Sequence, residues 1–225
     1  MKVFARDPAW DERMLYSLNE QLPSLLVNRD STLNHRNGQQ TLAADILGVH
    51  VIVKRYIGAY GWAARCRPQS LGRALRSYSH ASRLRQCGIP TPRALLCASF
   101  GVDMVTVTER LHANELYEAM RVQGWLNNWE DSIAQKLAAL MQTTSTHHIT
   151  HGDLHARNLL VDQSCNLWLI DLDGLRFHRS DFFYRRRRAK EEHRLGKSLY
   201  HASPRLCRKS GFVLEKNRWL WRSTG

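Results

Sequence analysis

The chain has 225 residues, of which 43 % are hydrophobic and 24 % charged, so it can build one large domain or two small lobes around a buried core. Its five cysteines are odd in number, widely spaced and without a CxxC pair, which argues against a disulfide framework and a cysteine zinc site. No apolar run approaches the roughly 18 residues of a membrane span, and the N-terminus lacks the apolar core of a signal peptide, so we expect a soluble cytoplasmic protein.

Positive charge is concentrated at the end of the chain. The formal net charge is +13, and from Arg176 onward 15 Lys and Arg residues stand against four acids, a net charge of +11. The run Arg185–Arg188 is typical of a solvated face. The basic tail as a whole calls for a polyanionic partner, and charge alone leaves open nucleic acid, an anionic membrane surface or a phosphorylated substrate.

The first half of the chain predicts strands and one helix. Residues Gln39–Tyr56 have the pattern of two strands around a turn at Leu47–Gly48, and the second strand carries a single lysine, Lys54. The segment Pro68–Cys87 has apolar residues three or four apart and begins with a proline that suits a first turn, which predicts a helix. A further strand follows at Val102–Thr108.

The second half predicts a helix, a polar loop and an acidic turn. Asn128 suits a helix cap, and an apolar face runs from Trp129 to Met141. The polar segment His151–Asn158 comes next, followed by two short strands around a turn within Leu159–Ile170. The second strand leads directly into Asp171-Leu172-Asp173-Gly174.

This order of elements favours an α+β class, because strands come first and helices later rather than in repeating βαβ units. We expect a small β-rich lobe over residues 1–110 with a helix near 68–87, and a compact, truncated helical lobe over residues 111–225. The second lobe would contain the polar loop at 151–158, the acidic turn at 171–174 and the basic tail at 176–222.

Four polar residues have the types and spacing that phosphoryl transfer needs. Lys54 lies in a strand, Asn158 follows Asp153 by five residues, and Asp171 follows Asn158 by thirteen. A strand lysine can hold the α- and β-phosphates of a nucleotide, and an amide with a carboxylate can bind Mg²⁺, which prefers oxygen ligands. A second carboxylate, that of Asp153, can accept the proton of the acceptor hydroxyl. The pattern therefore predicts an ATP- and Mg²⁺-dependent phosphotransferase.

Three motifs resemble those of protein-kinase-like enzymes and imply a two-lobed kinase fold. HGDLHARN (His151–Asn158) is similar to the H-R-D-x-x-x-x-N catalytic loop, with Gly152 in place of arginine, a form typical of bacterial small-molecule kinases such as aminoglycoside phosphotransferases. IDLDG (Ile170–Gly174) is similar to the D-F-G magnesium motif, and VIVK (Val51–Lys54) to V-A-I-K. The resemblance covers about residues 39–177.

More narrowly, the chain resembles the bacterial lipopolysaccharide kinase family of the InaA and Kdo-kinase type. Four segments carry this resemblance: LRQCGIPTP (Leu84–Pro92), THGDLHARNLL (Thr150–Leu160), IDLDGLR (Ile170–Arg176) and RLGKSL (Arg194–Leu199). It implies phosphorylation of an inner-core sugar, Kdo or heptose, on a lipid A-linked precursor at the cytoplasmic face of the inner membrane. The basic tail would meet anionic lipid and acceptor phosphates there, and no specific nucleic acid is expected.

Two features of protein kinases are missing around the predicted nucleotide site. No Glu occurs between Gln21 and Thr108, although the helix near 68–87 would be expected to supply the glutamate partner of the strand lysine at about Ser77. No G-x-G-x-x-G is present, and the loop over the phosphates would be Asn34–Gln40.

That loop contains a single glycine, Gly38, which is the candidate for backbone contact with the nucleotide. The glutamates upstream, Glu12 and Glu20, are possible substitutes for the missing partner of Lys54. Because these parts are incomplete, an inactive pseudokinase or a basic polyanion-binding protein stays open as an alternative.

Several residues of the loop and turn have more than one interpretation. His155 and Arg157 would contact the transferring phosphate or the acceptor, or they reflect only the ordinary polarity of a loop. Asp173 is an alternative to Asp171 as the metal ligand, and His151 is expected to brace the loop rather than act as a base. Another small-molecule kinase, acting on an aminoglycoside or choline-like substrate, is the remaining alternative, which the basic C-terminal half disfavours.

Overall fold

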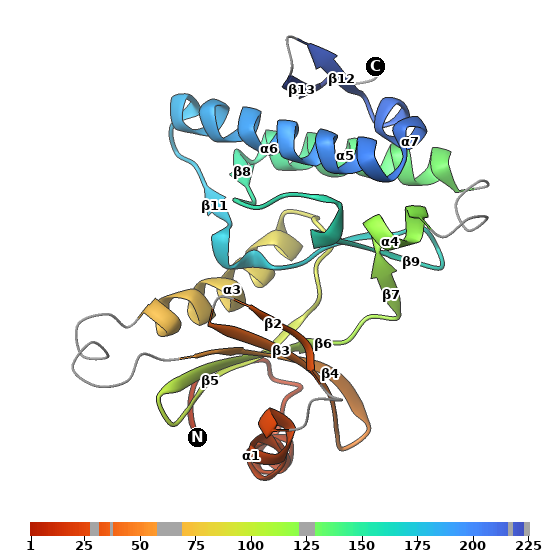
Figure 1. Cartoon of the computed structure of the whole chain (residues 1–225). Helices are drawn as coiled ribbons and strands as arrows, with labels where there is room; N and C mark the ends of the chain where they lie inside the picture. The colour runs from red at the N-terminus through yellow and green to blue at the C-terminus, as the bar shows by residue number, and fades with distance from the viewer. Residues whose placement is uncertain (28–31, 37, 58–68, 122–128, 216–217, 223–225) are drawn as a thin grey trace. The chain divides into compact units, whose positions relative to one another are not determined.

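The computed structural model describes residues 1–27, 32–36, 38–57, 69–121, 129–215 and 218–222, which form a mixture of helices and antiparallel strands (Figure 1). The predicted α+β class is therefore confirmed. The chain divides into two compact units, unit 1 with Met1–Arg83 and Pro92–Arg110, and unit 2 with Leu84–Thr91 and Leu111–Gly225. Pro68 and Asn128, at which we expected helices to begin, lie outside the described residues.

Unit 1 is built on an antiparallel sheet whose six described strands have the order β1-β5-β6-β4-β3-β2. The two strands predicted within residues 39–56 are β3 and β4, and the strand predicted near 102–108 is β6. The strands are β1 (Lys2–Arg6), β2 (Thr32–Arg36), β3 (Gln39–Ile46), β4 (Val49–Tyr56), β5 (Ala94–Phe100) and β6 (Asp103–Glu109). Because β4 lies between β6 and β3, Lys54 stands inside the sheet, opposite Thr41 and Thr106.

The two faces of this sheet have different coverings. Helix α1 (Glu12–Val27) places Leu18 and Leu22 in one core with Val51 and Val53 of β4. Burying each such side chain contributes about 1.5–3 kcal/mol. Side chains alternate along a strand, so Tyr56 lies on the other face, where it packs against Ala74 of α3 (Gln69–Gln86), the helix predicted near 68–87.

Unit 2 combines helices with small antiparallel sheets. Its long helix α5 (Glu130–Thr146) buries the predicted apolar face, including Ile133 and Leu137. The first part of the unit also contains β7 (Ala113–Glu115), α4 (Leu116–Arg121), β8 (Ile149–Thr150), the 3-10 turn η1 (Ala156–Asn158), β9 (Leu159–Asp162), β10 (Leu167–Leu169), the 3-10 turn η2 (Leu172–Gly174) and β11 (Arg176–Phe177). The loop between β8 and β9 is the predicted catalytic segment.

The basic tail folds as part of unit 2. It forms α6 (Asp181–Ala202), α7 (Pro204–Lys209), β12 (Phe212–Glu215) and β13 (Arg218–Trp221), and α6 lies alongside α5 (Figure 1). Of the run Arg185–Arg188, the first three residues are exposed, whereas Arg188 is buried and donates to Thr144 Oγ1 (2.9 Å) and the Met141 carbonyl (2.8 Å) of α5. None of the described helices is long and apolar enough to cross a membrane.

Candidate active site

His151 ties the start of the polar loop to Ile170, the residue that follows β10 and precedes Asp171. Its side chain is 3 % exposed, and Nε2 lies 2.7 Å from the carbonyl oxygen of Ile170. A carbonyl oxygen only accepts hydrogen bonds, so the proton of the neutral ring is on Nε2. Burial lowers the pKa of His151, against the opposing charges of Asp171 and Asp153. His151 is therefore a neutral brace, and both candidate carboxylates act on its ring.

Asn158 closes the loop from its other end. Its side-chain Nδ2 donates to the main-chain carbonyl oxygen of Asp153 (2.8 Å), and its main-chain carbonyl oxygen accepts from the N–H of Ile170 (3.1 Å). The first bond fixes the buried amide through its nitrogen, which orients the oxygen that Mg²⁺ would prefer. The second bond places Asn158 next to the residue that precedes Asp171. These two hydrogen bonds thus bring Asn158 together with Asp153, five residues before it, and with the residue that precedes Asp171, thirteen residues after it.

Asp171 has a left-handed backbone conformation, with φ 63° and ψ 58°, directly before the 3-10 turn η2. This conformation costs roughly 1–2 kcal/mol for most side chains, although aspartate tolerates it better than most. The two bonds to Ile170, from His151 and Asn158, hold the preceding residue in place. Strained positions of this kind cluster at active sites, which supports Asp171 rather than Asp173 as the functional carboxylate.

A close backbone approach between loop and turn explains the glycine of the HGD motif. Gly152 has φ +90°, and a Cβ atom at this position would lie 2.7 Å from the carbonyl oxygen of Gly174. On the other side of this contact, a Cβ atom at Gly174 would lie 3.2 Å from the carbonyl oxygen of His151. Neither the conformation nor the space suits a larger residue at position 152, so arginine cannot occupy it here.

Asp153 points into solvent, with its side chain 59 % exposed, and both of its oxygens have a neighbour. Oδ1 accepts from Nη1 of Arg194 on α6 (2.5 Å), and Oδ2 lies 3.5 Å from Nε2 of His155. Because Nδ1 of His155 accepts from the N–H of Arg157, the proton of a neutral His155 ring faces the carboxylate. The candidate base is therefore accessible, and it is held between a guanidinium and an imidazole.

One face of α6 holds the main chain of the polar loop 151–158. The carboxylate of Glu191 accepts from the N–H of Gly152, Nη1 of Arg194 donates to the Gly152 carbonyl (3.0 Å), and Ser198 Oγ accepts from the N–H of Ala156 (3.1 Å). These three residues are three and four positions apart, so they share a helix face. The sequence patterns missed this role, and only Arg194 and Ser198 belonged to a segment noted for its resemblance, RLGKSL.

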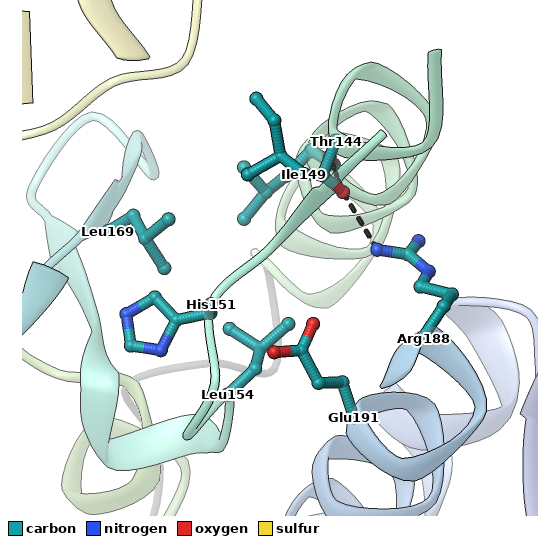
Figure 2. A pocket seen from close by; sticks show the side chains of 8 residues that line it. Thr144, Ile149, His151, Leu154, Leu169, Arg188 and Glu191 are labelled. Atoms are coloured by element: carbon teal, nitrogen blue, oxygen red, sulfur yellow. Dashed lines mark hydrogen bonds between the residues drawn. The ribbon is translucent and has the colours of Figure 1, made fainter. Parts of the chain in front are cut away.

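Glu191 is an unusual brace because it is a buried acid. Burial raises its pKa to about 7, against the Gly152 hydrogen bond and the charges of Arg188 and Arg194, which lower it. Figure 2 shows Arg188 extending from α6 toward Thr144, and Glu191 extending toward the segment that contains Ile149 and His151. The cavity among them is about 10 Å³, room for no more than one water molecule, so it is not a substrate site.

Arg157 is turned toward a different part of unit 2 from Asp153. Its Nη1 donates to Glu115 of β7 (3.1 Å) and Glu118 of α4 (2.7 Å), and its guanidinium lies 4.1 Å from the ring centroid of Tyr117. Two carboxylates and an aromatic ring thus engage the side chain, which ties the loop to α4. Of the two predicted phosphate contacts, His155 adjoins Asp153, whereas Arg157 is committed to these acids.

The predicted nucleotide residues Lys54 and Gly38 lie in unit 1, on neighbouring parts of the same sheet. Gly38 has φ +71° and follows β2, and its carbonyl accepts from the N–H of Ile57 (2.9 Å). Nζ of Lys54 lies 5.4 Å from the ring centroid of Tyr56, and Cζ of Arg73 from α3 lies 5.6 Å from the same ring. Helix α3 has no glutamate, and it brings a second cation toward the lysine face, an arrangement that favours an anionic ligand.

Two side chains of unit 2 fit the magnesium site that the sequence predicts. Within the described part of the chain, no group of three or more His, Cys, Asp and Glu side chains could hold a metal ion. Mg²⁺ is commonly held by only one or two protein ligands, with the remaining positions filled by water and substrate phosphates. The oriented amide of Asn158 and the exposed carboxylate of Asp171 match that ligand set.

Comparison with known proteins identifies the family of the chain. A family model described as the lipopolysaccharide kinase (Kdo/WaaP) family matches residues 50–212, a range that contains Lys54, the loop 151–158, Asp171 and Arg194. A search among curated proteins gives no match. Members of this family are kinases, for which ATP is the phosphate donor and a lipopolysaccharide-related molecule the acceptor. The match spans more than half of the chain, which therefore belongs to the lipopolysaccharide kinase (Kdo/WaaP) family.

Proposed function

We propose that the chain transfers the γ-phosphoryl group of ATP, in the presence of Mg²⁺, to a hydroxyl of an inner-core sugar, Kdo or heptose, of a lipopolysaccharide precursor. The observation that carries this proposal is that hydrogen bonds join the main chain at Asp153, Asn158 and Ile170, the residue directly before the left-handed Asp171, together with the family match. Phosphoryl transfer asks mainly for positioning and charge neutralisation, which these residues can provide.

Each residue would have a distinct task. Asp153 accepts the proton of the acceptor hydroxyl as the oxygen attacks the γ-phosphorus and the bond from that phosphorus to the β-phosphate oxygen breaks, which releases ADP. Lys54 holds the nucleotide phosphates, with the backbone at Gly38 over them. Asn158 and Asp171 would hold Mg²⁺, which neutralises phosphate charge when bound. His155 keeps the carboxylate of Asp153 in place.

The test is transfer of label from γ-labelled ATP with Mg²⁺ to a lipopolysaccharide precursor that lacks core phosphates. We expect label on the saccharide, dependent on both nucleotide and metal. An aminoglycoside and choline, assayed in parallel, should stay unlabelled, because Arg194 pairs with Asp153 and the C-terminal part of the chain is basic. Label on either of those substrates, or measurable Mg·ATP binding without label on the saccharide, would contradict the assignment of a core-sugar acceptor.

We further propose that the protein works at the cytoplasmic face of the inner membrane and touches it through an aromatic–basic patch at the start of α6. The patch consists of Phe182, Phe183, Arg186, Arg187 and Lys190, all of which are exposed. The two rings are 71 % and 62 % exposed, with their centroids 5.6 Å apart. The neighbouring acid, Asp181, is paired with Arg185, so the patch keeps its positive charge. Exposed phenyl rings beside cations suit an anionic lipid surface.

Replacing both rings, Phe182→Ser with Phe183→Ser, should weaken binding to vesicles of phosphatidylcholine and phosphatidylglycerol by about tenfold or more, since burying a phenyl ring contributes about 1.5–3 kcal/mol. Sedimentation with vesicles measures the effect. The matched control is Val213→Ser with Leu214→Ser, which removes two exposed apolar side chains of β12 and should leave binding unchanged. Equal losses in both variants, or salt-sensitive binding to DNA in place of vesicles, would contradict the membrane contact.

A further inference from the structure

The side chain of Arg194 stands on the solvent side of the candidate base. Its Nη1 donates to Oδ1 of Asp153 (2.5 Å) and to the carbonyl oxygen of Gly152 (3.0 Å). Both partners of the ion pair reach solvent, with Arg194 46 % and Asp153 59 % exposed. An exposed pair of this kind adds little to stability, so a ligand can open it at small cost.

This contact limits what can reach the base. A hydroxyl that gives its proton to Asp153 needs one of the carboxylate oxygens, and Oδ1 is already bound to Arg194 while Oδ2 faces His155. Water or a neutral hydroxyl offers the guanidinium no anion in exchange for the carboxylate. An acceptor with its own carboxylate or phosphate group does offer one, because the guanidinium fork matches both groups.

We infer that Arg194 is the acceptor-binding residue of this kinase: it recognises an anionic group next to the hydroxyl that is phosphorylated, and by turning to that group it opens Asp153 to the hydroxyl. The inference rests on the proposed function, and it favours an acidic sugar over a neutral one. Without such an acceptor, Arg194 shields the base and suppresses transfer of the phosphoryl group to water.

Two further observations single out Arg194 among the cations of the loop region. The guanidinium of Arg157, predicted to contact phosphate, is bound by Glu115 and Glu118. The contacts that Arg194 makes within the described part of the chain use Nη1 alone, so Nε and Nη2 remain for a second, bidentate partner. Because Arg194 also donates to the main chain at Gly152, a purely structural role is the competing explanation.

The experiment compares Arg194→Gln with Lys197→Gln, which removes an exposed cation three residues further along α6. Each protein is assayed with the saccharide of the precursor, with its carboxyl-reduced form, with its dephosphorylated form, and without acceptor. The two modified saccharides show whether the anion is a carboxylate or a phosphate. Thermal melting curves establish that both variants are folded.

For Arg194→Gln we expect a rise in KM for the anionic saccharide of about ten- to a hundredfold, the usual loss for a charge-assisted hydrogen bond, with the KM for ATP within about twofold. The preference for the anionic over the modified saccharide should disappear. Hydrolysis of ATP without acceptor should rise several-fold, and Arg194→Lys should restore part of the acceptor affinity. Lys197→Gln should behave as the native protein.

A structural role predicts a different pattern. If Arg194→Gln lowered transfer and hydrolysis together, or lost equal activity with anionic and modified saccharides, the inference would be overturned. Failure of the native protein to label any saccharide would refute the proposed function instead. In that case the assay without acceptor still tests the inference about Arg194, because unchanged or reduced ATP hydrolysis in Arg194→Gln would show that Arg194 does not shield Asp153.

Discussion

Asp153→Asn is expected to lower kcat by about a hundred- to ten-thousandfold while nucleotide binding stays near the native level. Asparagine has the shape of aspartate and still offers Oδ1 to Arg194, but it cannot accept a proton. The bond from Asn158 goes to the main-chain carbonyl of residue 153, so the substitution leaves the loop closed. Label transfer to the saccharide measures kcat, and titration with Mg·ATP measures binding.

Asp131→Asn is the matched control for this loss. It makes the same change in an exposed aspartate of unit 2 that is paired with Lys209 on α7, away from the loop, and should leave kcat unchanged. If Asp153→Asn kept more than about a tenth of native activity, proton acceptance by this residue would not contribute, since a general base supplies at least about a hundredfold. Loss of nucleotide binding along with activity would instead point to a role of Asp153 in holding the metal.

The elements of the fold that could be predicted from the sequence are those in which apolar residues recur with a regular period. The alternation in Gln39–Tyr56 predicted β3 and β4, and the apolar face of residues 129–141 predicted α5. Helix α1 was not predicted, although Leu15, Leu18 and Leu22 recur at helical spacing, because Pro23 lies inside it. Strand β5 was missed as well, since its apolar run, ALLCASF, does not alternate.

Helix α6 shows why the basic tail could not be assigned a structure. Its inward face contains Leu195 and Leu199, but two further buried positions are Arg188 and Glu191. A charged residue at a buried position removes the apolar periodicity on which helix prediction depends. Arg188 is buried because Thr144 and Met141 satisfy its guanidinium, and these partners lie more than 40 residues away in the sequence.

The candidate site also contains residues that the sequence predicts and residues that it does not. Asp153, Asn158 and Asp171 follow from local motifs whose spacing reflects one loop and one turn. The residues that hold this loop, Glu191 and Arg194, come from a helix some 40 residues later. Only Arg194 lies in a segment noted for its resemblance, RLGKSL, and nothing local there indicates contact with the loop. Arg157 shows the reverse case: its place in the loop suggested either a phosphate contact or ordinary loop polarity, and the structure pairs its guanidinium with Glu115 and Glu118.

Gly152→Ala should destabilise the protein by about 2–4 kcal/mol, among the larger effects of a single substitution. The φ of +90° is unfavourable for any residue with a Cβ atom, and that atom would lie 2.7 Å from the Gly174 carbonyl oxygen. For a chain of this length, the loss corresponds to a fall in Tm of roughly 4–16 °C. Thermal melting followed by circular dichroism measures it, and label transfer should be lost because the loop must move away from the turn.

Gly88→Ala separates the cost of a positive φ from the cost of the contact between residue 152 and Gly174. Gly88 also lies in unit 2 and has φ +74°, but a Cβ atom there would meet nothing within 4 Å, so only the backbone conformation is penalised, by about 1–2 kcal/mol. A larger fall in Tm for Gly152→Ala than for Gly88→Ala would isolate the contact between loop and turn. Equal falls would show that the contact is absent, and the glycine of HGD would then need another explanation, such as room for the substrate. With the contact present, the glycine is required by the close approach of residue 152 to the Gly174 carbonyl, whatever the acceptor of the kinase is.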